Sequence, residues 1–491
     1  MKRLFFICTS ILVFFALTSG AFAGETTSKS GITTFTMFVA ETSSVNDNGK
    51  SEVAEVIAEK TGVKLAMEFI VGDAQQKLTV MLASGDYPDF IYPKGDGPKF
   101  VEAGALLDLT DLIEEYGPNI KKHYGKYLPR HRFSEEDPGI YWLGSFGVDD
   151  ANLFPGSGHQ VQQAVLKELG CPKVRTVKDF EKVVRDYYEL HPTIDGKPTI
   201  PYTLCADGWR IMISVTNTAV FATGGNGDDG EYFVDFDTYD TVIHHTRPEE
   251  KEYFRWLNHM YNEGLLDQEF ATQKYDTYVE KITSGRVLGL STAWWEILSA
   301  EESLERAGRE ERKYTFFPVT LDERYEHKAF MQGGYVPNYG IGITTSCKDP
   351  VKAIKFFDWM CTEEAQILRY WGIEGKHWII DENDKRVWTE EYRTIKETDP
   401  DVKKRTGIGL YTYPFPEVGR GTRDSGGHLF QPETSIDSII AEYSDFEKEI
   451  LACYGAKANL DLWKIDWPVK PWGNAWQLTT VSYTHLRAHE T

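Results

Sequence analysis

Several aromatic side chains stand where a strand or helix gives way to a loop, which is where a side chain can reach a ligand. Tyr92 ends the short apolar stretch DFIYP, and Asp96 follows it in KGDGP. Trp209 and Arg210 lie in the glycine-containing stretch ADGWR. Flat aromatic faces stack on the C–H side of a sugar ring, while polar and charged side chains hydrogen-bond its hydroxyl groups. Residues of these types are those that a sugar-binding site uses, although aromatic residues alone are weak evidence for one.

Further tryptophans extend this candidate site. Trp294 and Trp295 follow the apolar stretch RVLGLS, and Trp142 lies in GIYWLGS. Neighbouring side chains point in different directions, so we expect only one of the adjacent pair, Trp294, to face a ligand. Some candidates have a competing structural role: Asp96 as a turn residue, Trp142 as a packing residue and Arg210 as the ion-pair partner of an acid. With 13 tryptophans and 26 tyrosines in the chain, most aromatic residues are expected elsewhere, in the core or on the surface.

Patterns that would support catalysis or metal binding are weak. Asp424-Ser425-Gly426-Gly427 matches the surroundings of a trypsin-type nucleophile, but no matching histidine segment accompanies it. His244-His245 lacks a third ligand at helical spacing, and residues 224–230 (GGNGDDG) lack the spaced carboxylates of a calcium loop. No glycine-rich nucleotide motif is present. We therefore predict no catalytic residue, no metal site and no cofactor, although a glycosidase carboxylate pair cannot be recognised from sequence alone.

The elements that must position these residues begin with strands and helices in alternation. Residues 32–40 and 63–72 are rich in β-branched and aromatic residues and predict strands. A helix is predicted from its cap at Ser51 to its stop at Gly62, and another over residues 74–85. Strands that alternate with helices are typical of a parallel sheet covered by helices on both faces.

A second α/β region follows the first. Thr176 caps a helix that is predicted to run to residue 190, and two further helices are predicted over residues 248–266 and 273–285. A strand over residues 340–345 and an amphipathic helix over 349–360 are compatible with either sheet. The chain is thus expected to form two α/β units and not one.

Both ends of the sequence are set apart from the rest. A basic start precedes an apolar run over residues 4–17, and residues 21–23 (AFA) match a signal-peptidase site. The run is shorter than the ~20 residues that cross a bilayer, so we predict a signal peptide over residues 1–23 and a polar linker over 24–31. Residues 481–491 (VSYTHLRAHET) continue no earlier pattern, and we predict that they form a non-native tail.

Composition limits the classes of function. A length of 491 residues exceeds one core and predicts two or three domains. The net charge of −22 argues against nucleic acid and against an anionic membrane surface as partners. Beyond the predicted signal peptide, the cysteines are widely spaced and odd in number, which predicts buried free thiols. They are Cys171, Cys205, Cys347, Cys361 and Cys453.

Segments along most of the chain resemble a known family. The stretch TGVKLAMEFIVGDAQQKLTVMLASGDYPD, followed in order by GALLDLTDLIEEYGPNIKKHYG, HHTRPEEKEYFRWLNHM, CKDPVKAIKFFDWM and WGIEGKHW, resembles family 1 of the extracellular solute-binding proteins of carbohydrate ABC importers. The similarity runs from about Ile32 to Gln477 and is greatest to the long lipoprotein-type binders of Firmicutes. Gly24 departs from that subgroup, which carries a lipid-bearing cysteine there. Asp195 is the sole acid of HPTIDGKPTI, where alginate-type relatives have a calcium loop.

The resemblance implies an α/β, two-lobed periplasmic-binding-protein-like fold of type II, with two parallel-rich sheets, a hinge and a cleft between the lobes. It assigns residues 32–145 plus 329–360 to the N-terminal lobe and residues 146–328 plus 361–477 to the C-terminal lobe. The candidates expected at the cleft are Tyr92, Asp96, Trp142, Trp209, Arg210, Trp294 and Trp295.

The resemblance also implies a function. The expected protein is a monomer outside the cytoplasmic membrane that captures a carbohydrate, in particular an oligosaccharide, and delivers it to the permease subunits of an ABC transporter without altering it. Two alternatives remain open: a secreted carbohydrate-active enzyme, and a sensor or adhesin that keeps the binding fold. Peptide ligands are also open, because one fold serves many ligands.

Overall fold

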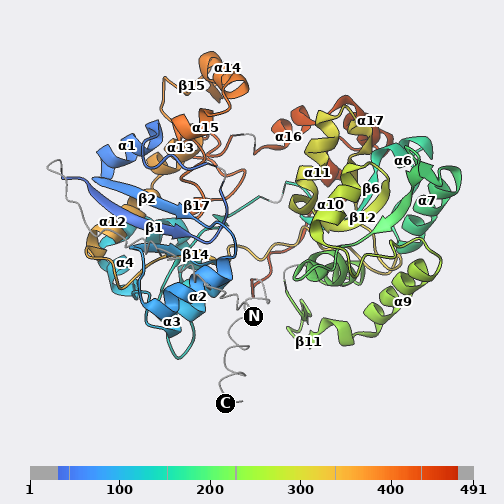
Figure 1. Cartoon of the computed structure of the whole chain (residues 1–491), viewed down its shortest axis with the longest axis horizontal. Helices are drawn as coiled ribbons and strands as arrows, with labels where there is room; N and C mark the ends of the chain where they lie inside the picture. Colours follow the sequence, from blue (N-terminus) through green and yellow to red (C-terminus); the bar gives the residue numbers. More distant parts are fainter. Residues whose placement is uncertain are drawn as a thin grey trace, which may run out of the picture.

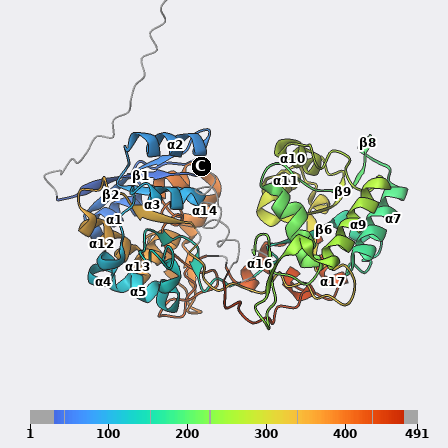
Figure 2. The ribbon, with the colours of Figure 1, turned by 90° about the horizontal axis from the view of Figure 1, so that it is seen from below.

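The computed structural model describes residues 31–473, apart from Ser44, Asn152, Gly227, Asp228, Asn338 and Glu433. The predicted signal peptide, nearly all of the predicted linker and the predicted C-terminal tail lie outside the described residues. Figures 1 and 2 show two lobes side by side, joined by segments that pass between them. Within the described part of the chain, no helix is both long and apolar enough to cross a membrane.

The first lobe is built on a five-stranded sheet with the order β2-β1-β3-β14-β4. Strand β1 (Thr33–Val39) pairs in parallel with β2 (Val63–Phe69) and β3 (Phe90–Tyr92). Strand β14 (Gly340–Ile343) is antiparallel both to β3 and to β4 (Leu143–Gly144). The reversed strand is therefore β14, which the chain enters from the other lobe.

Helices cover both faces of this sheet because successive residues of a strand point to opposite sides. Phe35 and Met37 of β1 enter one core, while Phe38 enters another. On the first face lie α1 (Glu52–Thr61), α4 (Thr110–Tyr116), α5 (Pro118–Tyr124) and α12 (Pro350–Met360), and on the second lie α2 (Ala74–Ser84) and α3 (Gly97–Glu102). Ser51 caps α1 by accepting a hydrogen bond from the Ala54 amide, and Gly62 ends the helix in a left-handed conformation, which confirms both predictions.

The second lobe contains a four-stranded sheet with the order β13-β6-β12-β9. Strand β6 (Ser157–Gln162) is antiparallel to β12 (Val287–Ala293) and β13 (Tyr314–Phe317), while β9 (Ile200–Thr203) is parallel to β12. Here too the reversed strand, β6, is the one that the chain enters from the other lobe.

Two cores cover this second sheet as well. One core holds side chains of α6 (Gln163–Glu168), α7 (Val177–Leu190), α8 (Asn217–Ala222) and α9 (Pro248–Asn262), and the other those of α10 (Tyr275–Thr283) and α11 (Trp294–Arg306). Helix α7 begins with a capping box between Thr176 and Asp179, in agreement with its predicted start. The predicted α/β architecture is confirmed in both lobes, but the second sheet is not rich in parallel pairs as predicted, because β6 is antiparallel to both of its neighbours.

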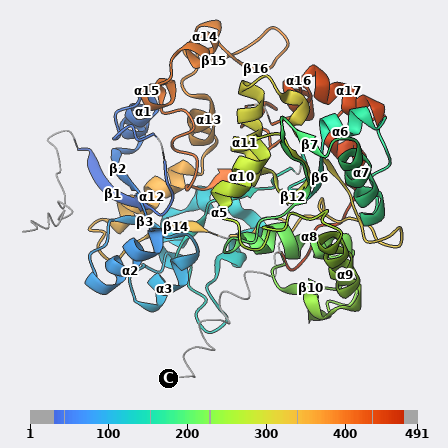
Figure 3. The same ribbon diagram turned by 45° about the vertical axis from the view of Figure 1, so that its right-hand side comes forward.

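The predicted assignment of residues 361–477 to the second lobe needs correction. Helix α13 (Glu363–Trp371) and the hairpin of β15 (Trp378–Ile380) and β16 (Arg386–Trp388) lie beside α1 of the first lobe in Figures 1 and 3. Leu368 and Phe415 belong to the same core as β1. The reason is that an apolar helix face does not reveal which of two sheets it will cover.

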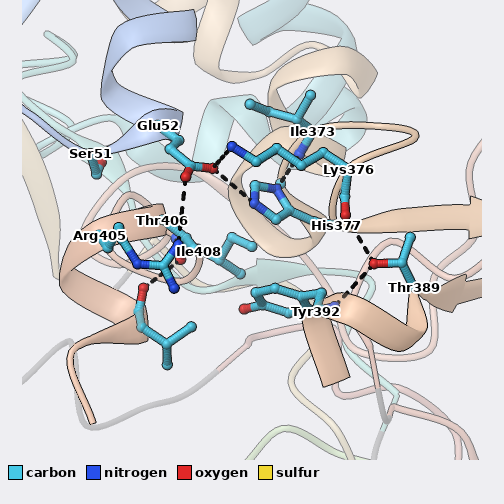
Figure 4. Close-up of polar contacts among 12 residues, drawn as sticks. Ser51, Glu52, Ile373, Lys376, His377, Thr389, Tyr392, Arg405, Thr406 and Ile408 are labelled. Atoms are coloured by element: carbon cyan, nitrogen blue, oxygen red, sulfur yellow. Dashed lines mark hydrogen bonds and ion pairs between the residues drawn. The ribbon is translucent and has the colours of Figure 1, made fainter. Parts of the chain in front are cut away.

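Charge pairing reinforces this docking on the first lobe (Figure 4). The Glu52 carboxylate, in the first turn of α1, lies 2.9 Å from both Lys376 Nζ and His377 Nε2. The Arg405 guanidinium, near the end of α15 (Val402–Thr406), approaches the other oxygen of Glu52 at 3.8 Å. Burial lowers the pKa of His377, and Glu52 partly opposes that shift. Three basic residues of the later segment thus surround one acid of α1.

The last helices return to the second lobe. Ile450 of α17 (Asp445–Cys453) belongs to the core of α6 and α7, and α16 (Ile436–Glu442) lies on the same side in Figure 1. A disulfide joins Cys171 to Cys453 across a sequence separation of 282 residues. The prediction of free thiols was therefore wrong for these two residues, since only the fold brings their Cα atoms within 6.3 Å. Three other cysteines, Cys205, Cys347 and Cys361, are free and buried, as predicted.

The disulfide should hold α17 on the second lobe. Replacing both Cys171 and Cys453 by Ser should lower stability by ~2–5 kcal/mol, because the cross-link restricts the unfolded chain. Thermal unfolding with and without reductant measures this effect. Reductant should lower the melting temperature of the native chain and leave that of the double variant unchanged; equal sensitivity of the two proteins would contradict the assignment.

A buried histidine should make the second lobe sensitive to acid. His159 is fully buried beside Phe180 and Tyr253, and burial lowers its pKa to about 3. The neutral ring is favoured in the folded chain, so its contribution is complete above the unfolded pKa of about 6.5 and is lost as the pH falls towards 3. Between pH 7.5 and 4.5, the native chain should lose ~2 kcal/mol more than His159→Gln in urea unfolding. Parallel pH profiles of the two proteins would refute this.

Candidate ligand-binding site

A pocket of about 500 Å³ lies where the two lobes meet. Its wall includes Tyr127 from η2 (Gly125–His131) of the first lobe and residues from the start of α11 in the second lobe. The segments that pass between the lobes complete the wall, around residues 149–157, 329–334 and 469–470. This volume lies within the range of about 300–1,000 Å³ that is usual for small-molecule sites.

Two adjacent tryptophans form one side of the pocket. Trp294 is half-buried, with its ring edge-on to Phe154 at 5.3 Å, and Trp295 is 44% exposed. Both side chains border the pocket, whereas the sequence led us to expect only Trp294 there. The difference arises because β12 ends at Ala293 and the pair opens helix α11. Successive residues of a helix diverge by only about 100°, and not by the half-turn of a strand.

Trp209 continues this aromatic wall beyond the pocket. Its ring is 48% exposed and stacks on that of Trp295, with centroids 5.7 Å apart and an interplanar angle of 28°. Arg210 takes the structural role that competed with ligand binding, since its Nε donates to Glu296 Oε2 at 2.9 Å. The structure thus brings together four of the residues proposed from sequence.

The three candidates from the first lobe do not border this pocket. Tyr92 is buried in the core, with its ring 5.1 Å from that of Tyr413, so it cannot offer an exposed face. Asp96 forms an ion pair with Lys99 at 2.6 Å. Trp142 packs over Gly97 and donates from Nε1 to the Pro337 carbonyl at 3.4 Å. Trp142 has the packing role named as its alternative, and Asp96 lies in the short 3-10 turn η1 (Lys94–Asp96), in agreement with the turn role named for it.

Residues that the sequence did not single out also line the pocket. Ile213 comes from a π-helical turn, η3 (Met212–Thr216), and Asn217 and Phe221 come from α8, which follows it directly. Such turns are rare and occur frequently at functional sites. The stretch IMISVTNTAVFATGG shows no pattern that distinguishes a π-turn from an ordinary helix, so composition could not have identified these side chains.

Charges around the pocket are largely paired. Lys470 lies 3.0 Å from Asp229, and both side chains are buried. Asp150 lies 3.6 Å from the Arg420 guanidinium, and burial raises the pKa of this carboxyl group while Arg420 opposes the shift. Asp149 borders the pocket as an exposed acid with a left-handed backbone, φ 58°. Among the described residues that line the pocket, Lys470 is the single cation, and it faces Asp229, while Asp149 offers hydrogen-bond acceptors.

The family described as "bacterial extracellular solute-binding protein" matches residues 52–373. The chain belongs to this family. The resemblance read from the sequence is thereby confirmed.

Two curated relatives of this solute-binding protein cover most of its length. It is 22% identical over 436 residues to lipoprotein LipO of Bacillus subtilis, covering 84% of this chain and 80% of the relative. It is also 22% identical over 383 residues to FusA of Streptococcus pneumoniae, a fructooligosaccharide ABC transporter substrate-binding protein, covering 74% of this chain and 68% of FusA.

Solved structures share the fold of this solute-binding protein. FusA in complex with kestose aligns with a TM-score of 0.62 at 16% identity, over 91% of this chain and 88% of FusA. The alginate-binding protein AlgQ2 without calcium aligns with a TM-score of 0.59 at 18% identity, over 89% of this chain and 84% of AlgQ2. These likenesses confirm the predicted two-lobed fold.

A C-terminal segment ties one wall of the pocket of the solute-binding protein to both lobes. The Lys470 amide donates to the Gln332 carbonyl at 2.7 Å, and Lys470 Nζ reaches Asp229 of the second lobe. In the first lobe, Arg130 donates to the Pro471 carbonyl at 3.2 Å and to the carbonyls of Gly333 and Tyr335. The segment thus fixes the part of the pocket wall around residues 329–334 and 469–470, here called the floor.

Breaking the buried ion pair of this segment should be costly. Asp229→Asn leaves the buried Lys470 charge without its acid and should lower stability by ~3–5 kcal/mol in urea unfolding. Asp96→Asn is the matched control, because the Lys99 of its pair is half exposed and such pairs contribute ~0–1 kcal/mol. An equal loss in both variants would contradict the role of the C-terminal segment.

Proposed function

We propose that this solute-binding protein captures an oligosaccharide outside the cytoplasmic membrane and delivers it, unaltered, to the permease of an ABC importer. The observation that carries the proposal is the pocket between the lobes with Trp294 and Trp295 on its wall. Family membership supports the extracytoplasmic location and the binding role. We further propose that the protein acts as a monomer, since one chain supplies both sides of the pocket.

The chemistry of the pocket wall suits a sugar. Indole faces stack on the C–H side of a pyranose or furanose ring, and the wall also offers the Asn217 amide and the Asp149 carboxylate for its hydroxyl groups. The relatives support the same class, because FusA is solved with kestose and named for fructooligosaccharides.

The charges favour an uncharged glycan. Lys470, on the pocket wall, faces Asp229, and Arg420 faces Asp150, another residue of the wall. A glycan with carboxylates would meet the exposed Asp149 carboxylate on the wall, at a cost in desolvation. Trp209 extends the aromatic surface beyond the pocket, which favours a ligand of more than one sugar ring.

The two lobes provide a mechanism for capture and release. A ligand that contacts both lobes stabilises the closed form only to the extent that it binds this form more tightly than the open one. The segments around residues 149–157 and 329–334 line the pocket and also connect the lobes, so a ligand there would contact the segments about which the lobes can rotate. A permease can then distinguish loaded from empty protein by its shape.

The first test is thermal unfolding of the chain from Gly24 against neutral oligosaccharides, acidic oligosaccharides and peptides. We expect a neutral oligosaccharide to raise the melting temperature with concentration, because it binds only the folded form, and to be recovered intact. A cleaved glycan would instead indicate a secreted enzyme. A shift with peptides alone would exclude the carbohydrate, and a shift with acidic glycans would contradict the charge argument.

Tryptophan variants connect any binding to this pocket. Trp294→Ala should weaken the binding of the glycan that shifts the native chain by about tenfold, or ~1.4 kcal/mol, without a large change in the melting temperature of the free protein. Trp467→Ala is the matched control, since Trp467 stacks with Lys464 and lies outside the pocket wall. Equal affinity of both variants would place the ligand elsewhere.

A further inference from the structure

The stacked rings of Trp209 and Trp295 are largely exposed to solvent. Both rings are nearly half exposed, yet they lie 5.7 Å apart and close to parallel. An exposed indole with few neighbours is free to change rotamer, so an ordered pair on the surface needs support from elsewhere. The residues directly behind the two tryptophans provide it.

Each tryptophan is followed in the chain by one partner of an ion pair. Trp209 precedes Arg210, and Trp295 precedes Glu296. Arg210 Nε donates to Glu296 Oε2 at 2.9 Å, with the side chains 22% and 2% exposed. The pair therefore joins the loop after β9 to the first turn of α11, the two segments that carry the stacked rings.

Tyr275, at the start of α10, contacts Arg210 and both segments that carry the stacked tryptophans. The Arg210 guanidinium lies 3.7 Å from the Tyr275 ring centre and 4.5 Å from that of Trp209, so it is held between two aromatic faces. The Tyr275 hydroxyl donates to the Glu296 carbonyl at 2.7 Å, and the Tyr275 amide donates to Asp207 of the loop at 3.1 Å. The start of α10 thus contacts both segments.

Burial of the Glu296 carboxylate costs free energy. Its Oε1 is buried without a hydrogen-bond partner among the described residues, and burial raises its pKa while Arg210 opposes the shift. A buried ion pair often stabilises a fold no better than well-packed apolar side chains, whereas it specifies one geometry. This combination indicates a role in geometry and not in stability alone.

We propose that Glu296 is a positioning residue: through Arg210, it fixes Trp209 and Trp295 as a preformed aromatic surface at the rim of the pocket. The assignment of that surface to a sugar rests on the proposed function. The positioning itself does not, because it is a property of the free protein. A preformed surface loses less side-chain freedom when a ligand binds, which improves affinity without a new contact.

The test measures the ring pair directly, without a ligand. Two stacked indoles couple their electronic transitions and give a couplet in circular dichroism, and Trp371 with Trp388, whose ring centroids lie 4.5 Å apart, also contributes to that of the full chain. The couplet of Trp209 and Trp295 is therefore the part of the signal that Trp209→Phe and Trp295→Phe each remove, and the effect of other variants is measured on this part. Glu296→Gln should reduce the couplet to about half or less and increase quenching of tryptophan fluorescence by acrylamide. Glu302→Gln is the matched control on the same helix, since Glu302 is exposed and pairs at 3.6 Å with Arg306.

If Glu296→Gln does not fold, Arg210→Lys tests the same contact. Arg210→Lys retains the charge and loses the planar group between the rings, so it should also weaken the couplet. A couplet of native strength in whichever of these variants folds would overturn the proposal, even if the melting temperature falls. A weakened couplet in a protein that binds no glycan would leave the positioning role intact and overturn only the proposed function.

Discussion

The structure depends on the way in which the chain passes between its two lobes. Each sheet contains one reversed strand, β14 in the first lobe and β6 in the second, and each of these strands is entered from the other lobe. The sheet of the first lobe is therefore completed by β14 only after the chain has passed through the second lobe, whereas the four strands of the second sheet lie within residues 157–317. Because the connecting segments also line the pocket, rotation of the lobes must change the pocket.

The two sides of the pocket are built differently. The aromatic side belongs to the second lobe and starts at the end of β12, where α11 begins with Trp294 and Trp295. The floor consists of connecting segments tied by backbone hydrogen bonds and by the buried pair of Lys470 and Asp229. A ligand held on the rigid aromatic side would meet Tyr127 and the rest of the first lobe as the lobes move together.

Local patterns in the sequence were sufficient to predict many helices and strands, but not to predict how these elements pack on one another. Ser51 and Thr176 start helices because a side-chain oxygen satisfies a free amide nearby in the chain. The docking of α13 and the pairing of Cys171 with Cys453 depend on contacts between distant segments, which no local pattern records. For the same reason, the sequence suggested Tyr92 and Trp142 as well as Trp294, although the first two pack inside the first lobe.

Arg210 shows how pairing of charges decides what a site can bind. From its type alone, it could bond a ligand or an acid of the protein. The structure pairs it with Glu296, and Lys470 and Arg420 are likewise engaged by acids. Lys470 and Arg420 thus face acids of the protein beside the pocket. Since Asp149 is exposed on the wall, the same arrangement supports the proposed preference for an uncharged glycan.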